Sequence, residues 1–230
     1  PTMDRRAFLR RSGLGVGAGH AGDGAQRDAA APGNRPIWQK PLPHFRQAYA
    51  AIDLGTNNCR LLIARPQDGE LVVIDAGAAY ENYASDVTRT FPINGTFTER
   101  QAEIYDVVLR SLDAGIAAAT AGVTNGHIDR VCRAVIEDAG FGDYFPHGAG
   151  HPLGLDVHEA GPDGPLLPGM VITIEPGIYI AAENMGIRIE DDILITESGG
   201  INLTGHIPRT REQIEAAVSE VLHRAFRPRP

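Results

Sequence analysis

From Leu71 onward, apolar and polar positions along the chain follow the periods of strands and helices. Short apolar runs predict strands, and a repeat of three to four residues predicts a helix whose apolar face includes Ile104, Val108 and Leu112. Thr98 and Gln101 have the spacing of a capping box at the start of that helix. The expected strands are 71–75, 83–93, 171–175 and 187–195, and the further helices are 126–139 and 211–225. Strands, then helices, then strands indicate the α+β class.

The chain before Leu71 has a different character. Residues 1–48 combine Ala, Gly, Pro and basic residues without periodicity, which predicts a disordered basic arm and linker. The stretch from Asp4 to Arg10 resembles a twin-arginine export signal, but the Gly-rich stretch after it is short for the apolar part of such a signal. We therefore expect a cytoplasmic protein, with export as the alternative.

Residues 49–70 predict a strand, a tight turn around Asp53 to Thr56 and a second strand. This hairpin resembles the first phosphate loop of exopolyphosphatase and guanosine-pentaphosphatase proteins, which belong to the actin-like ATPase superfamily. Backbone N–H groups of such a turn can approach phosphate. No second phosphate loop or nucleotide-binding segment follows in the sequence, so an actin-like phosphatase is the less favoured function.

The net charge of −8 is unevenly distributed, with +6 on residues 1–65 and −14 on residues 66–230. An acidic body argues against nucleic acid as a partner, because phosphate backbones bind basic surfaces. No apolar run reaches the length of about 18 residues that a membrane span needs, so no membrane partner is expected. Cys59 and Cys132 fit no metal or redox spacing and are read as ordinary thiols.

Several carboxylates lie in or beside apolar strands, where an unpaired charge is costly. Glu175 is the only charged residue between Met170 and Ile180. Asp75 ends the run LVVID, and Asp86 lies across the predicted turn, so the two side chains can approach each other across a hairpin. Two neighbouring carboxylates repel each other unless a proton or a metal lies between them. Each aspartate alone would also fit a turn or a helix cap.

A Gly-rich segment holds three histidines, His147, His151 and His158. Glu190 and Arg188 share the polar face of the predicted strand 187–195, a pattern that alone also fits a half-exposed strand. Together with the isolated carboxylates, the histidines favour a metal or catalytic site over separate structural roles. The spacing is not that of a zinc finger. One imidazole with mostly oxygen ligands suits Mn, Fe or Co.

Five motifs, in this order, resemble the aminopeptidase P and prolidase branch of the pita-bread metallopeptidases, which also include methionine aminopeptidase and creatinase. They are DAG at 75–77, SDVTRTFP at 85–92, HGAGHPLGLDVHE at 147–159, ITIEPGIYI at 172–180 and GIRIEDDILIT at 186–196. The resemblance implies a pita-bread catalytic domain at 71–230. It also implies that this domain is incomplete, because the family's first half has no counterpart before the DAG motif.

The resemblance further implies two divalent metal ions, most often manganese. Asp86 and Glu190 would bridge the two ions. Asp75 would bind one of them, and His151 and Glu175 would bind the other. The ions would activate a shared water for peptide hydrolysis.

The remaining roles also follow from the resemblance. His147 and His158 match residues that contact the substrate, Glu175 would move a proton to the leaving nitrogen, and Arg188 would hold a ligand carboxylate in place. The implied activity is that of an Xaa-Pro aminopeptidase, which cleaves the N-terminal peptide bond before proline. The missing half leaves a non-catalytic metal-binding fragment as the alternative, and its exposed sheet edge is compatible with a homo-oligomer.

Overall fold

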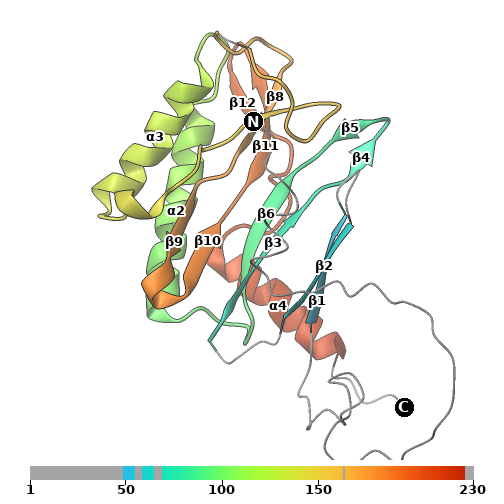
Figure 1. The fold of residues 1–230 in the computed structure, drawn as a ribbon, viewed down its shortest axis with the longest axis vertical. Helices are drawn as coiled ribbons and strands as arrows, with labels where there is room; N and C mark the ends of the chain where they lie inside the picture. The colour runs from blue at the N-terminus through green and yellow to red at the C-terminus, as the bar shows by residue number, and fades with distance from the viewer. Residues whose placement is uncertain (1–48, 55–58, 65–68, 163, 226–230) are drawn as a thin grey trace, which may run out of the picture. The chain divides into compact units, whose positions relative to one another are not determined.

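The computed structural model describes residues 49–54, 59–64, 69–162 and 164–225 (Figure 1). Its strands are β1 (Tyr49–Leu54), β2 (Cys59–Ala64), β3 (Leu71–Ala76), β4 (Ala79–Tyr80), β5 (Tyr83–Ala84), β6 (Val87–Pro92), β7 (Pro152–Leu153), β8 (Val171–Ile174), β9 (Gly177–Ile180), β10 (Met185–Arg188), β11 (Asp191–Thr196) and β12 (Gly199–Asn202). Its helices are α2 (Glu99–Ala118), α3 (Asn125–Asp138) and α4 (Arg211–Ala225), with short 3-10 turns η2 (Gly142–Tyr144) and η3 (Ala181–Glu183). The mixture confirms the α+β class.

The strands form antiparallel pairs rather than one continuous ladder. The largest sheet has four strands in the order β12-β11-β8-β7, and β9–β10 and β3–β6 form separate two-stranded ladders. Helices α2 and α3 lie together on one side of these strands (Figure 1). The polar side chains of the motifs lie on the other side, where the sheet that contains β8 and β11 approaches β3 and β6.

One apolar core joins the helices to the strands. Helix α2 begins with the predicted capping box, since Thr98 accepts from the backbone N–H of Gln101 and the Gln101 side chain accepts from the Thr98 N–H. Its buried face packs against β8, β9 and β10, which supply buried isoleucines to the same core. The fully buried members of this core include Ile104, Leu112, Ile136, Ile172, Ile174, Ile178, Ile187, Ile193 and Ile195.

Two strands expected to be continuous are interrupted, and both interruptions hold a candidate ligand. The strand predicted at 187–195 is divided into β10 and β11, with Ile189 and Glu190 outside either ladder. The backbone N–H of Glu190 donates instead to the Thr88 carbonyl at 3.1 Å. The break therefore turns the chain from one ladder to the next and connects Glu190 to β6.

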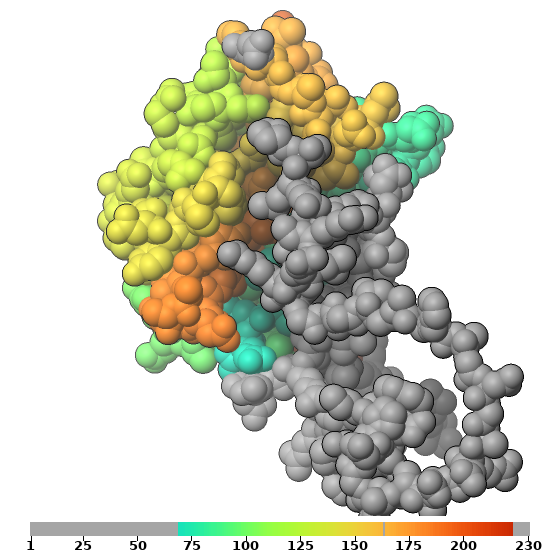
Figure 2. All heavy atoms as spheres, viewed as in Figure 1, coloured from blue at the N-terminus to red at the C-terminus, as the bar shows by residue number. Residues whose placement is uncertain are grey.

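The strand predicted at 83–93 is likewise divided into β5 and β6, with Ser85 and Asp86 between them. The short turn expected before it was wrong, because residues 77–86 contain the small β4–β5 hairpin. Glu81 and Asn82 adopt positive φ angles of 50° and 69° at its tip. Figure 2 shows this hairpin standing out at the edge of the molecule.

The predicted strand pair at the start of residues 49–70 is present as β1 and β2, which pair antiparallel. The turn residues Gly55 and Thr56 lie outside the described residues, as does the segment 1–48 with its export-like start. All described elements belong to one unit, Arg46–Pro230. No described helix combines the length and apolar character that a bilayer crossing requires.

Candidate metal centre

The hairpin of β3 and β6 brings the first two candidate carboxylates together. Asp75 near the end of β3 lies opposite Thr88 of β6, and Asp86 lies just before β6. Gly77 allows the approach, since a Cβ there would lie 2.0 Å from the Ser85 carbonyl oxygen. The pKa of Asp86 is raised to about 8, mainly by burial and secondly by the neighbouring Asp75 carboxyl.

Glu190 is the most enclosed of the candidate ligands, at 1% exposure. Its Oε2 accepts a short hydrogen bond from the Thr88 hydroxyl. Its Oε1 is buried and has no hydrogen-bond partner among the described residues. Burial and the charges of Asp86 and Glu175 raise its pKa well above the ordinary value. An orphaned carboxylate oxygen at this depth fits a site for a cation.

His151 lies in the segment between α3 and β8 and is oriented by its own backbone neighbour. Its Nδ1 is 3.1 Å from the Pro152 carbonyl oxygen, which makes Nδ1 the donor and leaves a lone pair on Nε2. That Nε2 is 3.8 Å from Asp86 Oδ2 and 3.6 Å from Glu175 Oε1. Burial lowers the pKa of His151, which favours the neutral imidazole that binds metals.

Glu175 follows β8 at the point where that strand leaves the sheet. Its backbone N–H donates to the Ala149 carbonyl at 2.8 Å, which ties it to the histidine segment. Burial raises the pKa of Glu175 to about 7, against an opposing effect from Arg188. The carboxyl thus lies between the imidazole of His151 and the guanidinium of Arg188, whose Nε is 3.9 Å from Glu175 Oε2.

These side chains form three overlapping groups, and within each group the possible ligand atoms lie within 4.8 Å of one another. The groups are Asp75–Asp86–Glu190, His151–Glu175–Glu190 and Asp86–His151–His158. The structure therefore brings together all five predicted ligands. Four carboxylates and one imidazole form a set that suits Mn, Fe or Co, so the residues fit the metals that the resemblance implies.

The two other histidines occupy different positions. His158 is exposed and lies at the margin of the cluster, with its ring 4.0 Å from that of His151. His147 belongs to none of the three groups. Its Nε2 is 3.0 Å from the Tyr179 hydroxyl, and its Nδ1 is 2.8 Å from the Gly148 carbonyl oxygen. Burial lowers the pKa of His147.

Arg188 connects the histidine side of the site to the carboxylates. Its guanidinium donates to Asp75 Oδ2 at 2.7 Å, to the Thr88 hydroxyl at 3.1 Å and to the Tyr179 hydroxyl at 3.2 Å. Tyr179 continues this chain to His147. Arg188 thus lies beside Asp75, one of the candidate ligands.

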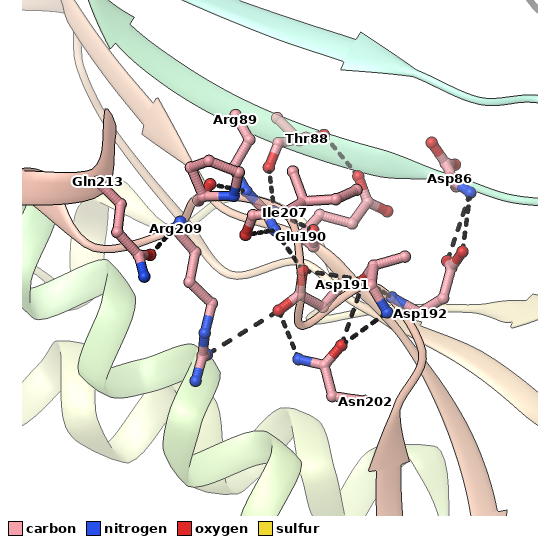
Figure 3. Close-up of polar contacts among 12 residues, drawn as sticks. Asp86, Thr88, Arg89, Glu190, Asp191, Asp192, Asn202, Ile207, Arg209 and Gln213 are labelled. Carbon is pink, nitrogen blue, oxygen red and sulfur yellow. Dashed lines mark hydrogen bonds and ion pairs between the residues drawn. The ribbon is translucent and has the colours of Figure 1, made fainter. Parts of the chain in front are cut away.

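Several residues important to this geometry were not singled out from the sequence. Arg89 and Asp191 form a buried ion pair behind Glu190, and Asp192 accepts from the Asp86 backbone N–H at 3.3 Å (Figure 3). The role of Asp191 could have been predicted from the sequence. It lies on the isoleucine face of strand 187–195, where a buried charge needs a partner. Thr88 carried no such signal, since its contacts with Glu190 and Arg188 join segments about 100 residues apart in the sequence.

Comparison with known proteins agrees with this site. The profile of "Metallopeptidase family M24" matches residues 41–197. The Xaa-Pro aminopeptidase of Escherichia coli is 42% identical over 200 residues, which cover 72% of this chain and 45% of that protein. The Xaa-Pro dipeptidase of Pyrococcus furiosus is 47% identical over 145 residues, covering 61% of this chain and 41% of the relative.

Solved structures show the same fold. The prolidase from Pyrococcus horikoshii OT3 superposes with a TM-score of 0.60 at 42% identity, covering 67% of this chain and 47% of that one. A putative aminopeptidase P from Bacillus anthracis gives 0.66 at 38% identity, covering 75% and 45%. The chain spans about half the length of the curated relatives it matches. It has the pita-bread fold of aminopeptidase P and prolidase, over part of its extent, and it belongs to metallopeptidase family M24.

Proposed function

We propose that this chain is an Xaa-Pro aminopeptidase that hydrolyses the N-terminal peptide bond before proline. The observation that carries the proposal is that Asp75, Asp86, His151, Glu175 and Glu190 fall into overlapping groups of possible metal ligands, and that Glu190, which two groups share, has a buried oxygen without a hydrogen-bond partner among the described residues. A buried cluster of acids without a cation would repel itself. The relatives named Xaa-Pro aminopeptidase and Xaa-Pro dipeptidase support the choice of reaction and substrate.

The ligand assignment follows the overlap of the three groups. Asp86, His151 and Glu190 each belong to two groups. Of these three, only the carboxylates can offer one oxygen to each of two ions, so Asp86 and Glu190 are the candidates to bridge them. Asp75 would complete one position, and His151 and Glu175 the other. Manganese is the proposed metal, because the donor set is rich in oxygen and contains a single imidazole.

When bound, the two ions would supply the Lewis acidity that activates a water near neutral pH and polarises the scissile carbonyl. Glu175 would then carry a proton to the leaving nitrogen. Arg188 would hold Asp75 in position through its 2.7 Å hydrogen bond.

The histidines would act on the substrate. His158 is exposed beside the cluster, where a peptide can reach it. His147 lies at the end of the Arg188–Tyr179 chain. Both are proposed to contact the peptide and to stabilise the negative charge that develops on its carbonyl oxygen. The substrate class is a peptide whose second residue is proline.

The test is to incubate the purified chain with Mn²⁺ and the peptide Arg-Pro-Pro, and to measure release of free arginine. We expect release that EDTA abolishes and that Glu190→Gln reduces by orders of magnitude. Arg-Ala-Pro is the control substrate and should be cleaved far more slowly.

Absence of arginine release from a chain that binds two ions would contradict the catalytic proposal. It would favour the non-catalytic metal-binding fragment. Release of phosphate from polyphosphate or nucleotides, without peptide cleavage, would instead favour the phosphatase interpretation of residues 49–70.

A further inference from the structure

An ion pair on α3 holds the segment that carries His147 and His151. Asp129 and Arg133 lie one turn apart on the helix, and the Arg133 Nε donates to Asp129 Oδ2 at 2.8 Å. The buried face of α3, represented by Ile128 and Cys132, packs against α2. The ion pair faces the chain that returns from α3 towards β8, drawn in yellow in Figure 1.

Both members of the pair bind the backbone of that returning segment. Arg133 donates to the Phe145 carbonyl at 2.9 Å and to the His147 carbonyl at 2.5 Å. Asp129 Oδ1 accepts from the Ala149 N–H at 2.9 Å. The guanidinium also lies 4.4 Å from the centroid of the Phe145 ring. These contacts fix the backbone before, at and after His147.

The imidazole of His147 is consequently held on several sides. Its ring makes edge contacts with the rings of Phe145, at 5.1 Å, and Tyr179, at 5.4 Å. Since Phe145 is itself fixed by Arg133, the ion pair determines both the backbone position of His147 and one wall of its environment. An i,i+4 pair on a helix surface contributes little to stability alone, so the backbone contacts of this half-buried pair are its main consequence.

The metal cluster depends much less on α3. His151 is tied to β8 separately, through the Thr173 N–H to the His151 carbonyl at 2.8 Å and the His151 N–H to the Thr173 hydroxyl at 3.1 Å. Asp75 and Asp86 are held by the β3–β6 hairpin, and Glu190 by Thr88. Glu175 is linked to the segment that the pair holds, through its N–H to the Ala149 carbonyl, but it also directly continues β8. Loss of Arg133, which contacts residues 145 and 147, should therefore leave the ligand set in place.

We propose that Asp129 and Arg133 are positioning residues, which set His147 for its work on the peptide without contributing to metal binding. This inference rests on the proposed function, because the step it affects is peptide hydrolysis. A misplacement of about 1 Å in a catalytic group can cost about 100-fold in rate. The pair therefore controls kcat rather than metal content.

The test compares Arg133→Gln with Arg130→Gln, a change of the same type on the same helix. Arg130 is exposed and donates no hydrogen bond to residues 145–151 among those described. We expect Arg133→Gln to lower kcat by about tenfold or more, with Mn²⁺ affinity measured by calorimetry unchanged within about twofold. Arg130→Gln should leave both quantities unchanged.

A double-mutant cycle distinguishes positioning from general destabilisation. If Arg133 acts through His147, then Arg133→Gln should change kcat by less than about twofold when His147→Ala is already present. Full additivity of the two effects, or a parallel loss of Mn²⁺ affinity, would overturn the proposal.

A structural readout keeps the inference testable if the unaltered chain proves inactive, an outcome that would count against the proposed function alone. The imidazole NMR signals of His147, assigned by their loss in His147→Ala, should shift in Arg133→Gln and stay in place in Arg130→Gln. Unshifted signals in Arg133→Gln would refute the positioning role.

Discussion

The guanidinium of Arg89 donates a hydrogen bond of 2.6 Å to the carboxylate of Asp191, and both side chains are almost fully enclosed (Figure 3). Arg89 also donates to the carbonyls of Glu190 and Pro208, at 2.5 and 2.7 Å. Asp191 accepts further bonds from Asn202 and Thr204. The pair therefore joins β6 to β11 directly behind the Glu190 side chain.

Replacing Arg89 by Met should strongly destabilise the protein. The change keeps the bulk of the side chain but leaves the Asp191 carboxylate buried without its cation, which typically costs about 3–5 kcal/mol. The measurement is the free energy of unfolding from urea titration. Arg100→Gln is the control, because it breaks an exposed pair with Glu183 and should have little effect. Equal losses in the two variants would contradict the structural role of the buried pair.

Replacing Thr88 by Val should weaken metal binding while preserving the fold. The Thr88 hydroxyl accepts from Arg188 Nε at 3.1 Å and donates to Glu190 Oε2, so it orients a proposed bridging ligand. Loss of such an outer contact commonly costs about 10–100-fold in metal affinity. Isothermal titration with Mn²⁺ measures the change, and circular dichroism checks that the secondary structure is retained. An unchanged affinity would show that Glu190 does not depend on Thr88.

The stability of the metal-free protein should fall as pH rises. The pKa values of Asp86 and Glu175 are raised to about 8 and about 7, so the folded state keeps protons that the unfolded chain releases near pH 4. The stabilisation is complete below about pH 4 and is lost through the window up to about pH 8. Mn²⁺ binds the ionised carboxylates, so its stabilising effect should grow over the same range.

Thermal unfolding with EDTA and with Mn²⁺, at about pH 5 and about pH 8, tests this linkage. We expect a lower midpoint with EDTA at the higher pH and a larger upward shift with Mn²⁺ there. A metal-free midpoint that rises with pH would contradict the burial of these acids.

Replacing Gly150 by Ala should displace the histidine segment from β8. A Cβ at this position would lie 2.0 Å from the Thr173 carbonyl oxygen, which is sheet backbone and cannot move freely. The expected results are a lower unfolding midpoint and weaker Mn²⁺ binding, because His151 follows directly. Gly148→Ala is the matched control, since a Cβ there would meet nothing within 4 Å. Similar behaviour of the two variants would refute the close approach.

The sequence predicted element types better than element limits. The helix at 211–225 has the expected bounds, and the helix predicted at 126–139 is observed one residue earlier as α3. The interruptions at Asp86 and Glu190 were missed, because no Gly or Pro marks a break in the sequence at either position. At these positions the backbone N–H groups of Asp86 and Glu190 donate to the Asp192 carboxylate and the Thr88 carbonyl, which lie about 100 residues away in the sequence.

For the candidate site, too, the sequence predicted some features and missed others. The isolated acids and clustered histidines identified the groups that need a partner, because burial of a charge is costly in any fold. Arg133 was not found, since a single exposed-looking arginine on a helix has no distinguishing pattern, and its contacts with residues 145–147 appear only after the chain turns back. The role of a residue that depends on strand register or on a reversal of the chain can be seen only in the folded structure.

Anomalous diffraction from crystals of the Mn²⁺-loaded chain tests the central claim most directly. The account predicts two anomalous peaks about 3.5–4 Å apart, both in contact with Asp86 and Glu190. Asp75 should contact one of the two peaks, and His151 and Glu175 the other. Peaks elsewhere in the molecule, or no peak among these five side chains, would contradict the account.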